Sequence, residues 1–257
     1  MAKIVFHIQT LTAIDREANA RNMAIMFHLG RHTKHEFLLS TPFRSSIDRG
    51  RNEAAKLAMD AECEYVFFLD DDMVIDPRTL DSLIVADRDI VMAHSYIRGY
   101  PYRPMCFKWK EKDAEVPSLE YFETDEELES LKDANGIVGE KHIAAVGFTC
   151  TLIKTSLLLK LNPPFFITNP HGMGTEDVYF CMRATAEVGK DVSIAVDMKY
   201  PTIHLGERES ISAHTVKDLR IFHETTNPDI IKLKKEGTRE GDCGDRAEDY
   251  NKKCLEA

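Results

Sequence analysis

Short apolar runs alternate with stretches of helical periodicity along the first hundred residues. We expect strands at residues 3–8, 36–41 and 65–69, because each run has strand length and ends in polar residues. Between these runs, apolar residues recur at helical spacing over 20–27 and again over 54–61. The third run is continuously apolar, which is typical of a strand covered on both faces. The chain therefore begins in the order strand, helix, strand, helix, strand.

The same alternation continues towards residue 206. The pattern predicts a helix opened by Pro77, then a strand at 89–93, a strand at 143–153, helices at 155–161 and 176–189, and a strand at 192–196. This order favours an α/β protein with one catalytic domain over residues 1–206. Its central sheet is expected to be mostly parallel and flanked by helices.

Residues 100–142 differ in character from the rest of this domain. They hold several prolines, and between Glu111 and Glu129 there are nine carboxylates against one lysine. We expect an acidic excursion over one face of the sheet, with a helix at 125–132, which is a solvated surface or at most a lid. Residues 207–257 are polar, and we expect this C-terminal extension to be partly weakly ordered.

Composition narrows the class of protein. The 43 acidic and 33 basic side chains give a formal net charge of -10, which disfavours nonspecific attraction to nucleic acid or anionic membranes. No apolar stretch is long enough to cross a bilayer, and the first residues lack the long apolar segment of a leader. The six cysteines form no C-x-x-C pair, which favours buried thiols in a reducing compartment. We expect a cytoplasmic protein.

Three adjacent carboxylates, Asp70, Asp71 and Asp72, follow the most apolar strand. Ligands of open α/β sheets bind outside the carboxyl ends of the strands, so these acids are expected to face a crevice. Adjacent carboxylates repel one another unless a cation or hydrogen bonds compensate, and hard divalent ions prefer oxygen ligands. A solvated turn that caps the next helix is the alternative. The position behind a buried strand favours the ion.

Two further elements carry chemistry only in combination. Glu176 and Asp177 open an amphipathic helix, where acids also favour the positive end of the helix dipole. His204 follows a short β-like segment, and a lone histidine is more often packed than a ligand. A cluster with Tyr96, Arg98 and neighbouring aromatics follows the fourth strand; it suits stacking on sugars or bases, although packing is the simpler interpretation.

Taken in order, these elements resemble the GT-A glycosyltransferases, particularly the large inverting group called family two, over roughly residues 3–206. Five motifs carry the resemblance: Arg51-Asn52 is similar to an A-R-N element, Asp70-Asp71-Asp72 to D-x-D, Gly147-Phe148 to a glycine-rich strand beside the donor sugar, Glu176-Asp177 to E-D, and His204-Leu205-Gly206 to H-x-G. Each motif is weak alone, whereas their order and separation make the set informative.

The resemblance implies a role for each matching position. Asp72 and His204 coordinate Mn²⁺ or Mg²⁺, while Asp70 supports the ion or contacts the ribose and sugar of a nucleotide-sugar donor, with Asp71 beside it. Asp177, next to Glu176, accepts the proton of the attacking hydroxyl. The remaining positions, Gln9, Thr10, Arg51 and Gly147, are expected to meet the nucleotide or allow the sugar a close approach.

The leading hypothesis is a metal-dependent glycosyltransferase that moves one sugar from a UDP- or GDP-sugar to a hydroxyl, with inversion. The Q-x-x-R-W element of polymer synthases is absent, and Ser40–Arg44 replaces the usual acidic element after the second strand. A nucleotidyltransferase is the alternative, although residues 9–13 lack the glycines of its usual loop; a noncatalytic nucleotide-sugar binder is another. The acceptor class stays open among carbohydrate, lipid-linked glycan, protein and a modified nucleic-acid base.

Overall fold

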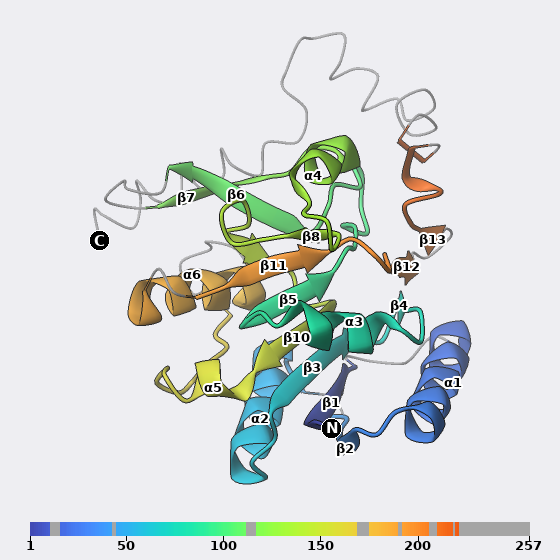
Figure 1. Ribbon diagram of the computed structural model, residues 1–257, viewed down its shortest axis with the longest axis vertical. Coiled ribbons are helices and arrows are strands. Elements are labelled where there is room, and N and C mark those ends of the chain that lie inside the picture. The colour runs from blue at the N-terminus through green and yellow to red at the C-terminus, as the bar shows by residue number, and fades with distance from the viewer. Residues whose placement is uncertain are drawn as a thin grey trace, which may run out of the picture.

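A seven-stranded sheet forms the centre of the protein in this computed structural model (Figure 1). The structure describes residues 1–10, 16–42, 45–111, 117–168, 175–189, 192–205, 210–217 and 219–220. The strand order is β2-β1-β3-β10-β5-β11-β8. In chain order these strands are β1 (Lys3–Gln9), β2 (Glu36–Ser40), β3 (Tyr65–Asp70), β5 (Ile90–Ala93), β8 (Ile137–Val138), β10 (Cys150–Lys154) and β11 (Ile194–Asp197).

Most strands of this sheet run in one direction. β1 pairs in parallel with β2 and β3, and β5 pairs in parallel with β11. β10 lies antiparallel between β3 and β5, and β8 lies antiparallel on the edge beside β11. The predicted α/β class with a mostly parallel central sheet is therefore confirmed.

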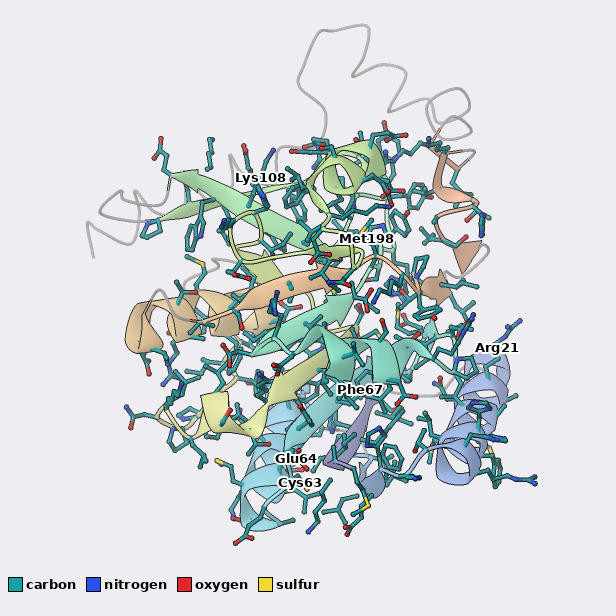
Figure 2. All side chains as sticks on the ribbon, viewed as in Figure 1. Arg21, Cys63, Glu64, Phe67, Lys108 and Met198 are labelled. Atoms are coloured by element: carbon teal, nitrogen blue, oxygen red, sulfur yellow. The ribbon has the colours of Figure 1, made fainter. Side chains whose placement is uncertain are left out.

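Helices cover both faces of the sheet, as the continuous apolarity of β3 predicts. Val66 and Phe68 of β3 join a core cluster with α2, α5 and α6, whereas Phe67 and Leu69 join a second cluster with α1 and α3. Phe67 is fully buried and is labelled in Figure 2. The helices are α1 (Arg16–His32), α2 (Ile47–Asp60), α3 (Thr79–Ala86), α4 (Asp125–Leu131), α5 (Thr155–Leu158) and α6 (Glu176–Val188).

Two small sheets lie outside the central one. In the first, β12 (Ile203–Leu205) pairs with both β4 (Met73–Val74) and β13 (Ser210–Ile211). In the second, β6 (Cys106–Glu111) pairs with both β7 (Ser118–Tyr121) and β9 (Ala145–Val146). The first of these sheets matters for the site, because it places the histidine of β12 next to the chain that leaves β3.

The single strand predicted at 143–153 is wrong, because the segment divides between two sheets. β9 pairs with β6, while β10 inserts antiparallel between β3 and β5. The chain between them is not in a strand and contains Gly147. Residues 143–146 and 150–153 are all buried. The hydrophobic pattern is therefore the same on both sides of the break and does not reveal where one strand ends and the next begins.

The acidic excursion is more ordered than its composition indicates. It contains β6, β7 and the expected helix α4, whose cap Thr124 accepts a hydrogen bond from the Glu127 backbone nitrogen. It then returns to the central sheet as β8, which the sequence did not predict. Residues 112–116 of the excursion and residues 221–257 of the extension lie outside the described residues. The beginning of the polar extension packs on the domain, because Ile211 and Val216 are buried against Tyr96 and Tyr102.

Four cysteines, Cys63, Cys106, Cys150 and Cys181, are free and buried, as expected; the other two lie outside the described residues. Within the described ranges, every helix is too short or too polar to cross a membrane.

His7 gives the fold a specific pH dependence. Its ring is fully buried in β1, with Nε2 3.1 Å from Gln9 Oε1 and Nδ1 3.0 Å from Ser40 Oγ. A neutral ring satisfies both contacts, with Nε2–H donating and Nδ1 accepting. Burial lowers the pKa of His7 to about 4, although the hydrogen bond to Gln9 acts in the opposite direction.

We expect His7 to lower the free energy of unfolding by about 3 kcal/mol as the pH falls from 6.5 to about 4. In this window the unfolded chain binds a proton at His7 and the folded chain does not, so stability is complete above pH 6.5 and declines below it. Urea unfolding of the wild type and His7→Gln at several pH values isolates this contribution. Parallel pH profiles for the two proteins contradict it.

Candidate active site

The three predicted carboxylates lie at the carboxyl edge of the central sheet. β3 ends at Asp70, which is in register with Gln9 at the end of β1. The Asp70 backbone nitrogen donates to the Thr149 carbonyl at 2.9 Å, and Asp71 and Asp72 form the turn into β4. All three side chains keep part of their surface exposed. The sequence therefore placed these acids correctly at an edge where ligands of such sheets bind.

Arg51 lies beneath the acids and joins elements that are far apart in sequence. Its side chain is 3% exposed, and its guanidinium pairs with Glu176 at the start of α6 and with Asp70 Oδ1 at 3.3 Å. It also donates to the Phe148 carbonyl and lies over the rings of Phe68 and Phe148. These buried contacts give Arg51 a structural role, and its expected contact with the nucleotide remains a prediction.

Burial raises the pKa of two of the acids. It raises the pKa of Asp70 to about 7, against the opposing effect of the Arg51 charge and with a further increase from the charge of Asp72. It also raises the pKa of Glu176, again with Arg51 opposing and Asp177 adding to the shift. The charges of Asp72 and Asp177 both act on Asp70, so both residues lie near it.

His204 meets Asp72 directly. Nε2 of His204 lies 3.2 Å from Asp72 Oδ2, while Nδ1 donates to the Tyr96 carbonyl at 2.8 Å. Since Nδ1 donates to a carbonyl, a neutral ring turns the lone pair of Nε2 towards a carboxylate oxygen. Two such lone pairs face each other stably when a proton or a cation lies between them. The pair is therefore built to hold a positive charge.

Protonation states of the pair agree with this geometry. Burial acts to raise the pKa of Asp72, yet the hydrogen bond and charge of His204 hold it below its ordinary value. Burial likewise acts to lower the pKa of His204, yet Asp72 holds it above its ordinary value. In the absence of a metal, a proton shared by the two groups satisfies both.

Of the three predicted metal ligands, Asp72 and His204 meet and Asp70 turns to Arg51 instead. Across the described ranges, no three His, Cys, Asp or Glu side chains form a group that holds a metal. An oxygen and an imidazole nitrogen nevertheless suit Mn²⁺ or Mg²⁺ when phosphate oxygens and waters supply the other ligands. The pair fits an ion that arrives with a diphosphate.

Asp177 is held against the chain that follows β9. Its Oδ2 accepts from the Phe148 backbone nitrogen at 3.2 Å, and its Oδ1 accepts from the Val178 backbone nitrogen at 2.7 Å. Gly147 has no room for a side chain, because a Cβ there lies 2.4 Å from Met105 Sδ and 3.5 Å from Asp177 Oδ2. A side chain at this position therefore requires the Met105 side chain to move, and the expected contact with the donor sugar remains a prediction.

The end of β1 supplies two further predicted residues. Gln9 is buried, and its Oε1 accepts from His7, whereas its amide nitrogen lacks a hydrogen-bond partner in the part of the chain that the structure describes. Thr10 donates a hydrogen bond to Asp71. Burial, followed by the charge of Asp72, raises the pKa of Asp71. Both side chains lie beside the acids, and nucleotide binding by them remains a prediction.

Tyr96 and Arg98 were recognised in the sequence as part of an aromatic and basic cluster, but their contacts with His204 and Asp72 were not predicted. Tyr96 orients His204 through its carbonyl and anchors its own hydroxyl on Asp125 at 2.5 Å, where His94 also binds. Arg98 donates to Asp72 Oδ2 at 2.8 Å. The aromatic and basic cluster was visible in the sequence, and burial of Tyr96 and Tyr102 confirms packing for those two. The contacts across the sheet had no local signal.

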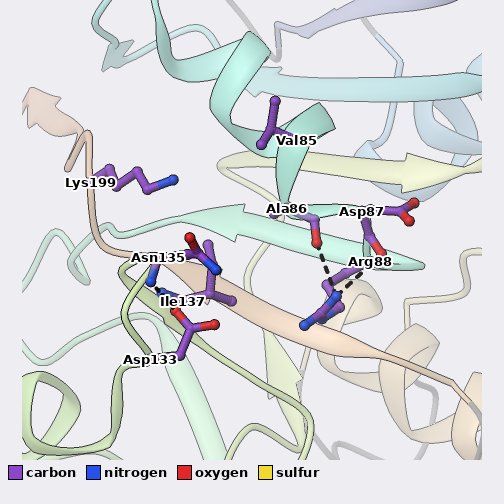
Figure 3. Close-up of a pocket in the computed structure, with 8 residues that line it drawn as sticks. All are labelled: Val85, Ala86, Asp87, Arg88, Asp133, Asn135, Ile137 and Lys199. Atoms are coloured by element: carbon purple, nitrogen blue, oxygen red, sulfur yellow. Dashed lines mark hydrogen bonds between the residues drawn. The ribbon is translucent and has the colours of Figure 1, made fainter.

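A hollow of about 280 Å³ elsewhere does not coincide with these residues (Figure 3). Its two acids and two bases balance in charge, and Arg88 donates to the Ala86 carbonyl at its rim. None of the predicted site residues lines it. The lining consists of Val85, Ala86, Asp87, Arg88, Asp133, Asn135, Ile137 and Lys199.

The chain is similar to known proteins only in comparisons with solved structures. A scan against models of protein families finds no match, and a search of curated proteins finds none. Among solved structures, A197 from STIV is 17% identical, covers 82% of this chain and 93% of its own, and has a TM-score of 0.47. Two enzymes are similar at a lower level.

The first is mannose-1-phosphate geranyltransferase from Thermus thermophilus, with 12% identity, 79% of this chain and 76% of that chain covered, and a TM-score of 0.38. The second is inositol-1-phosphate CTP transferase from T. maritima, with 11% identity, 88% and 78% covered, and a TM-score of 0.39. At these identities the similarity concerns the fold and assigns no reaction to this chain.

Proposed function

We propose that the protein is a metal-dependent glycosyltransferase that moves one sugar from a nucleoside-diphosphate-sugar to an acceptor hydroxyl, with inversion. One observation carries the proposal: Arg51 ties the end of β3 to the start of α6, while His204 of β12 meets Asp72 of the same turn. Three distant segments thus bring a base candidate and a cation-holding pair to one sheet edge. This is where an open α/β sheet binds ligands.

Asp72 and His204 would hold Mn²⁺ or Mg²⁺. When bound, the ion supplies positive charge that holds the diphosphate and stabilises it as the leaving group. The protein itself orients this histidine, because the Tyr96 carbonyl fixes the ring of His204 so that Nε2 faces Asp72.

Asp177 would receive the proton of the attacking hydroxyl on its carboxylate. Backbone donors from Phe148 and Val178 fix the direction of this carboxylate, and the side chain stays partly exposed. Glu176, held by Arg51, positions the first turn of α6. Asp70 and Asp71 would contact the ribose and sugar, and the unpartnered amide nitrogen of Gln9 would donate to the nucleotide near Thr10.

A panel of UDP- and GDP-sugars tests the proposal through thermal unfolding. With Mn²⁺ present, we expect at least one donor at about 100 times its Kd to raise the Tm by roughly 5 °C or more, because ligand binding stabilises the folded state alone. His204→Ala is expected to remove the part of this shift that depends on Mn²⁺. The proposal is wrong if no donor binds with or without metal, and His204 is no ligand if its variant keeps the full metal dependence.

Nucleotidyl transfer is the second candidate, and it is the kind of reaction named for one of the similar structures, the inositol-1-phosphate CTP transferase. The products separate the two. A glycosyltransferase releases a nucleoside diphosphate from a nucleotide-sugar, whereas a nucleotidyltransferase releases pyrophosphate from a nucleoside triphosphate and a sugar phosphate. Acceptors to be tried are carbohydrates, hydroxyl-bearing proteins and modified nucleic-acid bases. Binding without turnover under any condition identifies a noncatalytic binder.

A further inference from the structure

Arg98 pairs with Asp72, the carboxylate that would hold the metal in the proposed function. It lies on the loop that follows β5, its side chain is 57% exposed, and its Nη1 donates to Asp72 Oδ2 at 2.8 Å. The same oxygen lies 3.2 Å from His204 Nε2. Two cationic groups from separate segments therefore converge on one carboxylate oxygen.

A metal ion and Arg98 compete for this oxygen. An ion that binds Asp72 Oδ2 and His204 Nε2 comes within a few ångströms of the guanidinium, and like charges at such distances repel each other strongly. The Arg98 side chain is 57% exposed and that of Asp72 is 23% exposed. The ion displaces the guanidinium at small cost, because its own charge replaces that of the arginine beside Asp72. The arginine remains tethered to its loop beside the site.

A diphosphate held by the ion gives Arg98 a second partner. Guanidinium groups bind phosphate oxygens with two parallel hydrogen bonds, whereas Arg98 donates to Asp72 from Nη1. Exposure on a loop leaves the side chain room to turn. Asp71 and Asp72 are both influenced by the charge of Arg98, so its departure is balanced by the charge of the arriving ion.

We propose that Arg98 has two positions: it neutralises Asp72 in the ligand-free protein, and it binds the diphosphate of the donor once a divalent ion has taken Asp72. This inference rests on the proposed function. It differs from a simple surface ion pair in predicting that loss of Arg98 has opposite effects on the ion and on the nucleotide.

Calorimetric titrations of wild type, Arg98→Ala and Arg98→Lys test this with two probes, Mn²⁺ alone and UDP or GDP at saturating Mn²⁺. We expect Arg98→Ala to bind Mn²⁺ about 2- to 5-fold more tightly, because its competitor is gone. We expect it to bind the nucleoside diphosphate about 10-fold or more weakly. Arg98→Lys keeps the positive charge but lacks the two parallel donors of a guanidinium. Its affinities for Mn²⁺ and for the nucleoside diphosphate should therefore lie between those of wild type and Arg98→Ala.

Arg78→Ala is the matched control, because Arg78 is also an exposed arginine paired with an aspartate, Asp76, at 2.7 Å. It should leave both affinities unchanged. If wild type binds a nucleoside diphosphate with Mn²⁺ and Arg98→Ala binds it equally well, the inference is wrong and the proposed function stands. If wild type binds neither UDP nor GDP with Mn²⁺, the proposed function fails and the inference fails with it.

Discussion

Arg51→Met is expected to lower the free energy of unfolding by about 3–5 kcal/mol, the usual cost of removing one partner of a buried ion pair. The guanidinium is 3% exposed and is the cation next to the equally buried Glu176. Methionine fills much of the same space, so the loss reports the uncompensated charge more than a cavity. Urea unfolding at pH 7 measures it.

Two variants separate charge from packing. Arg49→Met lies two positions earlier on α2, where the arginine is 74% exposed and pairs with Glu53, and it should cost less than about 0.5 kcal/mol. Arg51→Met combined with Glu176→Gln should recover part of the loss, because the second change removes the stranded charge. A double variant no more stable than Arg51→Met alone contradicts the role of Arg51 as the counter-ion of Glu176.

Local signals account for the parts of the fold that the sequence predicted. Residues 65–69 are continuously apolar because β3 is covered on both faces, and the acids after it mark the point where the strand leaves the core. Helix α6 begins at the Glu176 that the sequence placed in an opening turn. Each of these inferences uses neighbours along the chain and needs no knowledge of distant partners.

Pairing between distant segments accounts for what the sequence left out. β8 is two residues long and is defined by its contact with β11, so no hydrophobic period reveals it. The break between β9 and β10 is equally invisible, because the chain is buried on both sides of it.

The candidate site likewise has a part that the sequence predicted and a part that it did not. Its acids and histidine were identifiable as residue types in order, whereas their geometry depends on groups without a motif. The backbone carbonyl of Tyr96 orients His204, and any residue at that position supplies a carbonyl. Arg51 was recognised by its motif. Its burial between Asp70 and Glu176 had no local signal, because it follows from the packing of α2 against β1 and β3 and from the pairing with the start of α6.

Asp177→Asn is expected to reduce sugar transfer by about 10²- to 10⁴-fold while donor affinity stays within about 2-fold. The amide has the shape of the carboxylate but does not accept a proton from a hydroxyl at neutral pH. Asp177 contacts backbone nitrogens of Phe148 and Val178 and lies apart from the Asp72–His204 pair in its hydrogen bonding, so the change leaves the proposed donor contacts in place. Single-turnover transfer and donor titration together measure the two quantities.

The substitution has a structural cost that the controls must remove. An asparagine side chain has one oxygen for the two backbone donors that Asp177 satisfies, so a loss of about 1 kcal/mol in stability is expected. Asp60→Asn, at an exposed carboxylate paired with Lys56, matches the change in charge without touching the site. An equal fall in donor affinity and transfer in Asp177→Asn indicates that Asp177 binds the donor and is not the base. Unchanged transfer removes the residue from the reaction, because a hydroxyl that still loses its proton must give it to another group.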